Sequence, residues 1–383
     1  MRLPMLLSSK YIIKKESARE FFINLLIVTF IIFAMILELK IESILPITES
    51  LVLLTGTLAV FFIFLNQYRY TIFKINKSIF LVLIILFFIL LNSVFVRNYI
   101  LIGAIFNLIT SATIAYQLVR NKNSEYLYLI PFYFIVTYIL IRLSINLDPN
   151  EVFQRSRNYI SFFLIITVVP YYFLKFKNSK PTSSIPILIV LIISIYSLSR
   201  SGSASAFILF CGVILSKNLN KKALAIFLTS FFVVIVAFLS YLIANYEEAA
   251  EVSRLFSFLD TLQNGARVKI LSNYIEEMDF IGFLIGIDTN SPKILDFGGS
   301  YLPGHVHSSV LNFVSVVGAS FLLCFYYVLK TIKFLFKNNI PMMLFFVAIF
   351  LRAATDTGLL FSYFDYVIWV FIMTMFFYKK ESF

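Results

Sequence analysis

Residues 185–215 read "IPILIVLIISIYSLSRSGSASAFILFCGVIL", two apolar runs separated by a short polar turn. The runs cover residues 185–199 and 203–215, and Arg200 lies in the turn between them. An α-helix needs about 20 mainly apolar residues to cross about 30 Å of hydrocarbon. The pattern therefore predicts two membrane helices joined by a tight turn, and it raises the question of why an arginine stands between them.

The composition of the whole chain indicates the same environment. Hydrophobic residues make up 60% of the 383 residues, and the mean hydropathy is +0.91, well above the values of soluble domains. Open strands would leave backbone groups unpaired in lipid, and the alternating polarity of a membrane β-barrel is absent. We expect an all-α, polytopic integral membrane protein with a single transmembrane domain over residues 1–383.

Apolar runs predict about 12 transmembrane helices, the first of them retained because the basic N-terminal 20 residues lack a signal-peptide cleavage site. The spans are expected near residues 21–37, 51–65, 78–95, 99–118, 127–143, 159–174, 185–199, 203–215, 223–244, 308–329, 341–357 and 362–378.

Basic residues predict the orientation of these helices, because loops rich in lysine and arginine stay cytoplasmic. The N-terminal tail, alternate loops and the C-terminal tail carry 21 of the 32 basic residues. Both termini are therefore expected in the cytoplasm. The net charge of +12 follows from this bias, and no nucleic-acid partner is needed to explain it.

The two predicted faces differ in the kind of basic residue. The cytoplasmic set has 17 lysines and four arginines, whereas the outer set has eight arginines and three lysines. A guanidinium can hold two phosphate oxygens at once, whereas an ammonium is a mobile point charge. The bias favours an outer site for a phosphate-bearing ligand; pairing with loop carboxylates or lipid headgroups is the alternative for any single arginine.

The longest stretch outside the spans, residues 245–307, is predicted as a large outer loop between the ninth and tenth helices. Its segment 253–275 can form an amphipathic helix at the membrane interface. Both histidines of the chain, His305 and His307, stand at its end. Because loops on a rigid scaffold often carry function, this loop is a candidate for chemistry.

Three predicted helices begin on the outer face with basic and small polar residues. Their starts read "QRSRN" with Arg155 and Arg157, "SRSGS" with Arg200 and Ser201, and "HVHSS" with His307. Helix N-termini offer free amide donors and partial positive charge, so the three can converge on one anion. Ordinary serine caps in short turns are the alternative.

Arg352 is expected inside the eleventh span. Counted from Pro341, it lies about 16 Å along the helix, toward the outer leaflet. An arginine at this depth should face the bundle interior or water. Asp356 follows one turn later on the same face, so a structural ion pair and a ligand contact are both open.

The order and spacing of these residues resemble the bacterial O-antigen polymerase and ligase superfamily. The resemblance lies in "SLSRSGSASAF", in "GARVKIL" with Arg267, in "FLIGID" with Gly286, and in "HSSVLNFVSVVG" with His307. It covers about residues 155–360. In that family the last motif usually has His-Asn, and Ser308 replaces the asparagine here.

The resemblance implies a metal-independent glycosyltransferase of the bacterial cytoplasmic membrane that acts at its outer face on sugars linked to undecaprenyl diphosphate. Arg200 and Arg267 would hold the diphosphate, with Arg157 and Arg352 as further candidates and Ser201, His305 and Asp356 in support. His307 would be the catalytic base or orienting group for the acceptor hydroxyl. No cofactor or metal is expected. The implied partners are the lipid-linked donor and acceptor, the bilayer, a chain-length regulator and a flippase.

Three other functions stay open. A ligase with the same motifs would transfer the finished glycan to lipid A core. A flippase for lipid-linked oligosaccharides would also need basic residues, but transporters place ionisable groups near the midplane and often show two related halves. A structural or permease-like membrane protein is the third. We expect the polymerase, making an O-antigen or a capsule.

Overall fold

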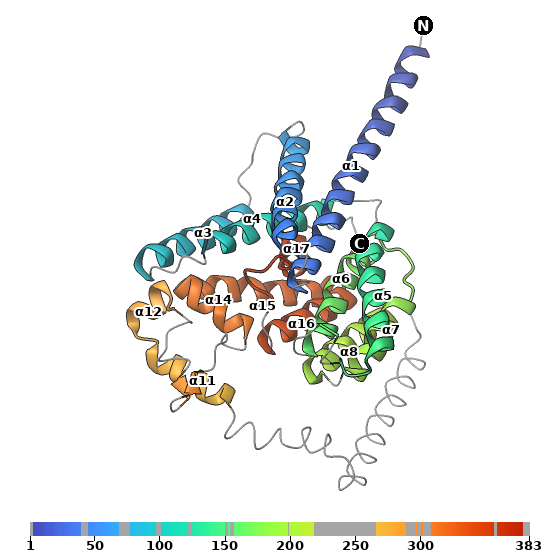
Figure 1. The fold of residues 1–383 in the computed structure, drawn as a ribbon. Coiled ribbons are helices and arrows are strands. Elements are labelled where there is room, and N and C mark those ends of the chain that lie inside the picture. The colour runs from blue at the N-terminus through green and yellow to red at the C-terminus, as the bar shows by residue number, and fades with distance from the viewer. Residues whose placement is uncertain are drawn as a thin grey trace.

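The fold is known from a computed structural model, which describes residues 3–39, 45–68, 77–96, 101–120, 125–149, 152–153, 157–197, 199–217, 266–288, 296–297, 300–301, 308–355 and 358–377. The helices are α1 Leu3–Glu38, α2 Leu45–Tyr68, α3 Lys77–Val96, α4 Leu101–Arg120, η1 Glu125–Tyr128, α5 Leu129–Ile145, α6 Asn158–Lys177, α7 Ile185–Tyr196, α8 Arg200–Leu215, α11 Ala266–Glu277, α12 Phe280–Ile285, α14 Ser309–Val317, η3 Gly318–Ser320, α15 Phe321–Asn338, α16 Ile340–Thr355 and α17 Tyr366–Phe377 (Figure 1).

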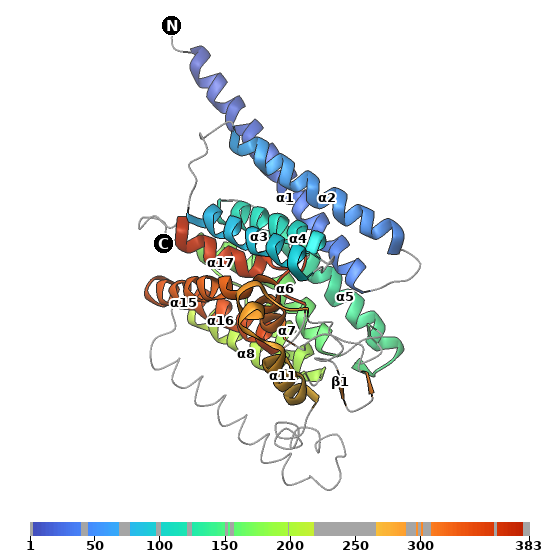
Figure 2. The same ribbon diagram turned by 90° about the vertical axis from the view of Figure 1, so that its left-hand side faces the viewer.

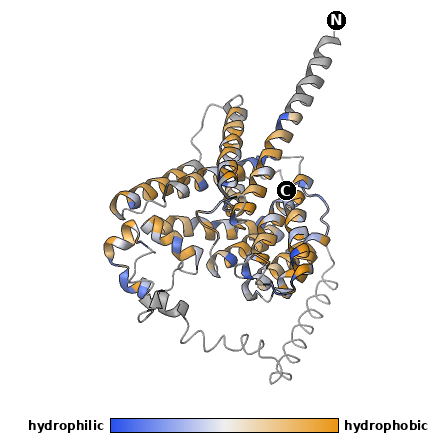
Figure 3. Cartoon of the chain, viewed as in Figure 1, coloured by the Kyte–Doolittle hydropathy of each residue, from blue (hydrophilic) through white to orange (hydrophobic). Residues whose placement is uncertain are grey.

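The fold is that of a helical membrane protein. Within the described residues, five helical segments are long and apolar enough to cross a membrane: 18–38, 47–65, 125–145, 158–177 and 309–338. Shorter apolar helices accompany them. Figure 3 shows the apolar residues along the length of these helices. Eleven of the twelve expected segments overlap described helices, the tenth of them two helices, and 223–244 lies outside the described residues.

Two details differ from the expectation. The tenth segment, expected as one helix over 308–329, is α14, a 3-10 turn at Gly318 and then α15, which runs on to Asn338. Gly318 has φ +52°, a conformation that glycine adopts without steric cost. The segment between α12 and α14 also holds two short antiparallel strands, β1 Asp296–Phe297 and β2 Ser300–Tyr301.

The helices are stacked side by side, with α6 inside the stack. Figure 2 shows α1 and α2 along one side, α3 and α4 next, then α17 and α6, and α15, α16 and α8 at the other side. Nearly all of α6 from Ile160 to Phe176 is buried. Helix α6 is therefore the centre around which the other elements are positioned.

Candidate functional site

Helices α6 and α8 are joined where they begin. The first turn of α8 follows Ser199, whose extended backbone and side-chain Oγ, 3.3 Å from Gly202 N, form an ordinary N-cap. The same hydroxyl donates to Asn158 Oδ1 of α6 at 2.9 Å. Ser161 Oγ, one turn into α6, lies 3.2 Å from Ser199 Oγ. The two N-termini are thus held together by a small polar cluster.

Gly202 allows this close approach. A Cβ atom on Gly202 would lie 2.0 Å from Ser161 Oγ and 2.4 Å from Ser161 Cβ. Both Ser161 and Ser199 are buried, so neither can move into solvent. Gly202 is therefore a packing requirement of the junction between α6 and α8.

Arg352, in the last turn of α16, reaches this junction from a third helix. Its side chain is 1% exposed. Nη1 donates to Ser201 Oγ at 2.6 Å, and Nη2 donates to the carbonyl oxygen of Asn158 at 2.5 Å. One planar guanidinium therefore links the first turns of α8 and α6, a geometry that a single ammonium cannot reproduce.

The electrostatics of the junction favour an anion. A helix N-terminus carries roughly half a positive charge from its aligned peptide dipoles, and two such termini meet the Arg352 guanidinium here. Arg157 is the half-buried N-cap of α6 and Arg200 is the first residue of α8. An anionic oxygen bound at the junction would be stabilised by the two helix N-termini and the Arg352 guanidinium.

The third expected N-terminus, that of α14, packs against the segment that follows α16. Ser308 caps α14, its Oγ lying 3.4 Å from Leu311 N. Ser309 Oγ accepts a hydrogen bond from Leu359 N at 3.2 Å, and the ring of Phe313 stacks on Phe361 at 5.2 Å. The three helix N-termini therefore lie against the C-terminal part of α16 or the residues directly after it.

That segment, residues 358–365, has an unusual backbone. Leu360 and Phe361 have φ angles of +60° and +72°, which cost a bulky residue about 1–3 kcal/mol each. The buried carboxylate of Asp365 accepts hydrogen bonds from Phe361 N, Ser362 N and Ser362 Oγ. Asn107 of α4 donates to the carbonyl oxygen of Phe361 at 2.8 Å. These contacts hold a strained turn beside the α14 N-terminus.

The segment with α11 and α12 is anchored to α3 and α14. Asn92 Nδ2 donates to the carbonyl oxygens of Ile285 and Ser315, both at 3.1 Å. A Cβ on Gly286, which has φ +104°, would lie 2.0 Å from the Ser315 carbonyl oxygen. A Cβ on Gly318 would lie 2.4 Å from the Leu284 carbonyl oxygen. Both glycines of the quoted motifs thus lie where this segment meets α14.

Tyr274 of α11 adds a second contact to the same anchor. Its hydroxyl lies 3.4 Å from the Leu311 carbonyl oxygen and accepts a hydrogen bond from Ser315 Oγ at 3.0 Å. Burial is the main influence on its phenol and raises its pKa. The phenol therefore stays protonated and available as a donor to α14. Helix α11, residues 266–277, overlaps the amphipathic helix expected over 253–275 at 266–275, and residues 253–265 are outside the described residues.

The structure brings some of the expected site residues together. Arg352 and Ser201 are hydrogen-bonded, and Arg157 is adjacent to Asn158 in the same junction. For Arg200 and Arg267, only the positions in the first turns of α8 and α11 are described. The expected catalytic residue His307, with His305 and Asp356, lies outside the described residues.

Sequence reasoning missed three residues of this region. Ser161 and Ser199 complete the cluster between α6 and α8, and Asp365 holds the turn after α16. A signal existed for Asp365, because "SYFD" at 362–365 has the spacing of a capping box ahead of an apolar helix. In the described ranges no group of three or more His, Cys, Asp and Glu side chains is placed to hold a metal ion.

The chain was compared with protein-family models, with curated proteins and with solved structures, and no match was found in any of the three comparisons.

Proposed function

We propose that this protein is a glycosyltransferase that polymerises undecaprenyl-diphosphate-linked oligosaccharide repeat units into a surface polysaccharide. The observation that carries the proposal is the junction at which Arg352 joins Ser201 and Asn158. It supplies a guanidinium and two helix N-termini at one place, the donors that a diphosphate requires. The motif order from "SLSRSGSASAF" to "HSSVLNFVSVVG" connects that anion site with the O-antigen polymerase and ligase superfamily.

The proposal includes a topology of twelve spans with both termini in the cytoplasm and the site on the outer face of the bacterial cytoplasmic membrane. Hydrogen bonds between helices support the alternation. Asn92 of α3 contacts Ile285 and Ser315 at ends assigned outward. Lys177 of α6 donates to Leu118 of α4 at ends assigned inward. In each pair, the residues in contact come from ends that the alternation assigns to the same side.

The proposed chemistry follows from the charges. The oxygen of the acceptor hydroxyl bonds to the anomeric carbon as the bond from that carbon to the diphosphate breaks, and the electrons of that bond pass to the diphosphate. Arg352, Arg200, Arg267 and Arg157 would stabilise the negative charge on the leaving diphosphate. His307 would accept the hydroxyl proton, since an imidazole titrates near neutral pH.

A flippase would also need a basic site. Transporters place their ionisable groups near the membrane midplane and often show two related halves. Arg352, about 16 Å along its span, lies close to that depth, so its position does not separate the two functions. The motif order from "SLSRSGSASAF" to "HSSVLNFVSVVG" favours the polymerase. Ligase activity shares the same junction and is separated from polymerase activity only by the acceptor.

The experiment is complementation of a deletion strain with Arg200→Ala and His307→Ala variants, with the surface glycan separated on a gel. The polymerase proposal predicts loss of the polymer ladder while single repeat units still reach the surface. Loss of all repeats from the surface would instead indicate a flippase, and accumulation of long lipid-linked polymer would indicate a ligase. An unchanged ladder in both variants, expressed at the wild-type level, would contradict all three.

A further inference from the structure

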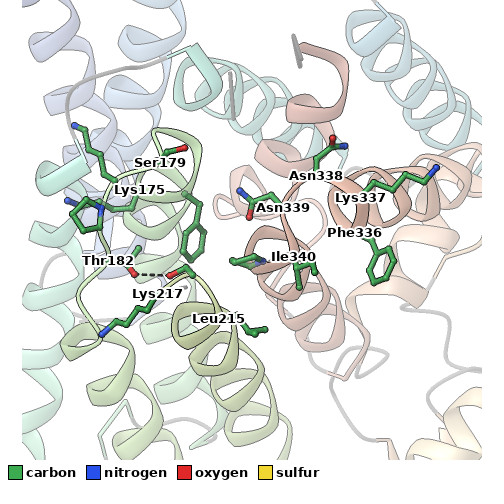
Figure 4. A pocket seen from close by; sticks show the side chains of 15 residues that line it. Lys175, Ser179, Thr182, Leu215, Lys217, Phe336, Lys337, Asn338, Asn339 and Ile340 are labelled. Atoms are coloured by element: carbon green, nitrogen blue, oxygen red, sulfur yellow. Dashed lines mark hydrogen bonds between the residues drawn. The ribbon is translucent and has the colours of Figure 1, made fainter. Parts of the chain in front are cut away.

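A cavity of about 960 Å³ lies at the opposite end of the helices that form the candidate site. It forms where α6, α8 and α15 end and where α16 begins. Its polar lining includes Lys180, together with Lys175, Lys217, Lys337, Thr182 and Asn339 (Figure 4). Loops rich in lysine assign this end to the cytoplasm. The volume is within the range of small-molecule sites.

The four lysines are only partly neutralised. Lys180 Nζ lies 2.7 Å from Glu125 Oε1, and Lys175 Nζ lies 3.7 Å from the same oxygen. Lys217 donates to Ser184 Oγ at 2.9 Å. Within the part of the chain that the structure describes, neither Lys217 nor Lys337 has a carboxylate partner. The ammonium groups of Lys175 and Lys180 therefore lie at Glu125, which does not line the cavity, and Lys217 and Lys337 are the lysines left to a ligand.

Helix ends explain part of this positive charge. The C-termini of α6, α8 and α15 each carry roughly half a negative charge, about −1.5 in total, and the N-terminus of α16 offsets about +0.5 of it. Lysines beside helix C-termini are expected for that reason. Lys217 and Lys337 together carry two positive charges, however, so the cavity keeps an excess of about one positive charge after the helix ends are counted.

An apolar rim accompanies the lysines. Phe336 and Ile340 line the cavity and are 62% and 44% exposed. The opposite wall carries the hydrogen-bonded pair Thr182 Oγ1 and Ser216 Oγ, 2.9 Å apart (Figure 4). Hydroxyl groups and ammonium groups next to exposed apolar side chains match a ligand that has a phosphate attached to an acyl chain. Basic pockets between membrane helices on the cytoplasmic side bind such headgroups.

We propose that this cavity binds the phosphate of an anionic phospholipid headgroup from the cytoplasmic leaflet, with the acyl chains against Phe336 and Ile340. The inference does not depend on the glycosyltransferase activity, because it uses the other ends of α6, α8 and α16, and it shares with that proposal only the orientation of the helices. A bound headgroup would connect α6 and α8 with α15 and α16. Free phosphate has the same anionic chemistry, and the experiment separates the two sources.

The test is native mass spectrometry of the purified full-length protein with phosphatidylglycerol, with phosphatidylcholine and with inorganic phosphate. A double variant, Lys217→Gln with Lys337→Gln, removes two exposed charges of the cavity. The matched control, Lys330→Gln with Lys333→Gln, removes two exposed lysines of α15 that do not line it. We expect the first double variant to bind phosphatidylglycerol about tenfold more weakly and the control to bind it as the wild type does.

A charge-preserving variant, Lys217→Arg with Lys337→Arg, should retain binding and separates loss of charge from loss of folding. Preference for phosphatidylglycerol over both phosphatidylcholine and inorganic phosphate would support the lipid as the ligand. Equal binding of inorganic phosphate would overturn the lipid source. Equal binding of phosphatidylcholine, or unchanged binding by the Lys217→Gln and Lys337→Gln variant, would overturn the site itself.

Discussion

Arg352 is the residue on which the candidate site depends most. A buried guanidinium that donates to one hydroxyl and one carbonyl on different helices fixes both helices relative to α16. Lysine carries the same charge but presents one nitrogen, which cannot reach both acceptors in the same geometry. The identity of the side chain, beyond its charge, should therefore decide the function of the site.

We predict that Arg352→Lys lowers polymer synthesis by at least about tenfold, the effect of losing roughly 1.4 kcal/mol of a charge-assisted contact. The measurement is product formation by purified protein from a defined lipid-linked repeat. Arg142→Lys, in the last turn of α5, is the matched control and should keep wild-type activity. Wild-type activity of the Arg352→Lys variant would show that Arg352 is not part of the functional site.

Gly202 gives a prediction for the packing of the same junction. Gly202→Ala places a methyl group 2.0 Å from Ser161 Oγ, and such overpacking costs typically about 1–3 kcal/mol. Gly103→Ala is the control, because a Cβ there meets nothing within 4 Å and alanine favours the helix. Thermal unfolding in detergent should show a lower Tm for Gly202→Ala only. Similar Tm values for the two variants would contradict the close approach of α6 and α8.

The residue that follows the C-terminal cap of helix α6 has a strained backbone conformation. Ser179 has φ +51° and follows the helix in the position that glycine usually occupies. We predict that Ser179→Gly raises the free energy of unfolding by about 1 kcal/mol. Asn178→Gly, at φ −90°, should give no gain, because no strain is relieved there. Chemical denaturation of both variants checks the prediction, which is wrong if the two shifts are equal.

One side chain of α3, that of Asn92, anchors the segment from α11 to α12. Asn92→Ala removes both hydrogen bonds, to the Ile285 and Ser315 carbonyl oxygens, and leaves buried acceptors unsatisfied at about 1–3 kcal/mol. We predict faster hydrogen exchange over residues 266–288 with unchanged exchange in α6. Val94→Ala, an exposed neighbour on α3, should change neither. Unchanged exchange in Asn92→Ala would show that the segment is held by other contacts.

For the whole molecule, the sequence predicted the helices well and their contacts poorly. Long apolar runs predict a membrane helix because the bilayer sets the required length, so eleven expected segments overlap described helices. The break at Gly318 was missed because it depends on the Leu284 carbonyl oxygen, which belongs to a segment more than 30 residues earlier. Hydropathy carries no information about such a contact.

In the candidate site, too, some features could be predicted from the sequence and others could not. The polar helix starts at Asn158, Ser201 and Ser309 could be predicted from local sequence, since capping residues act within one turn. The hydrogen bonds of Arg352 could not, because its partners are 151 and 194 residues away in the sequence. An arginine inside an apolar helix predicts some buried partner, but only the packing of α16 against α6 and α8 identifies it.

The central claim is that helix N-termini and arginines form a diphosphate site beside Arg352. The most direct test is the affinity of the purified protein in nanodiscs for undecaprenyl diphosphate and for undecaprenol, in wild type and in an Arg157→Gln, Arg200→Gln double variant. The account predicts that wild type prefers the diphosphate by at least about a hundredfold, the effect of two charge-assisted contacts, and that the double variant loses this preference. Equal affinity of wild type for the two lipids would contradict it.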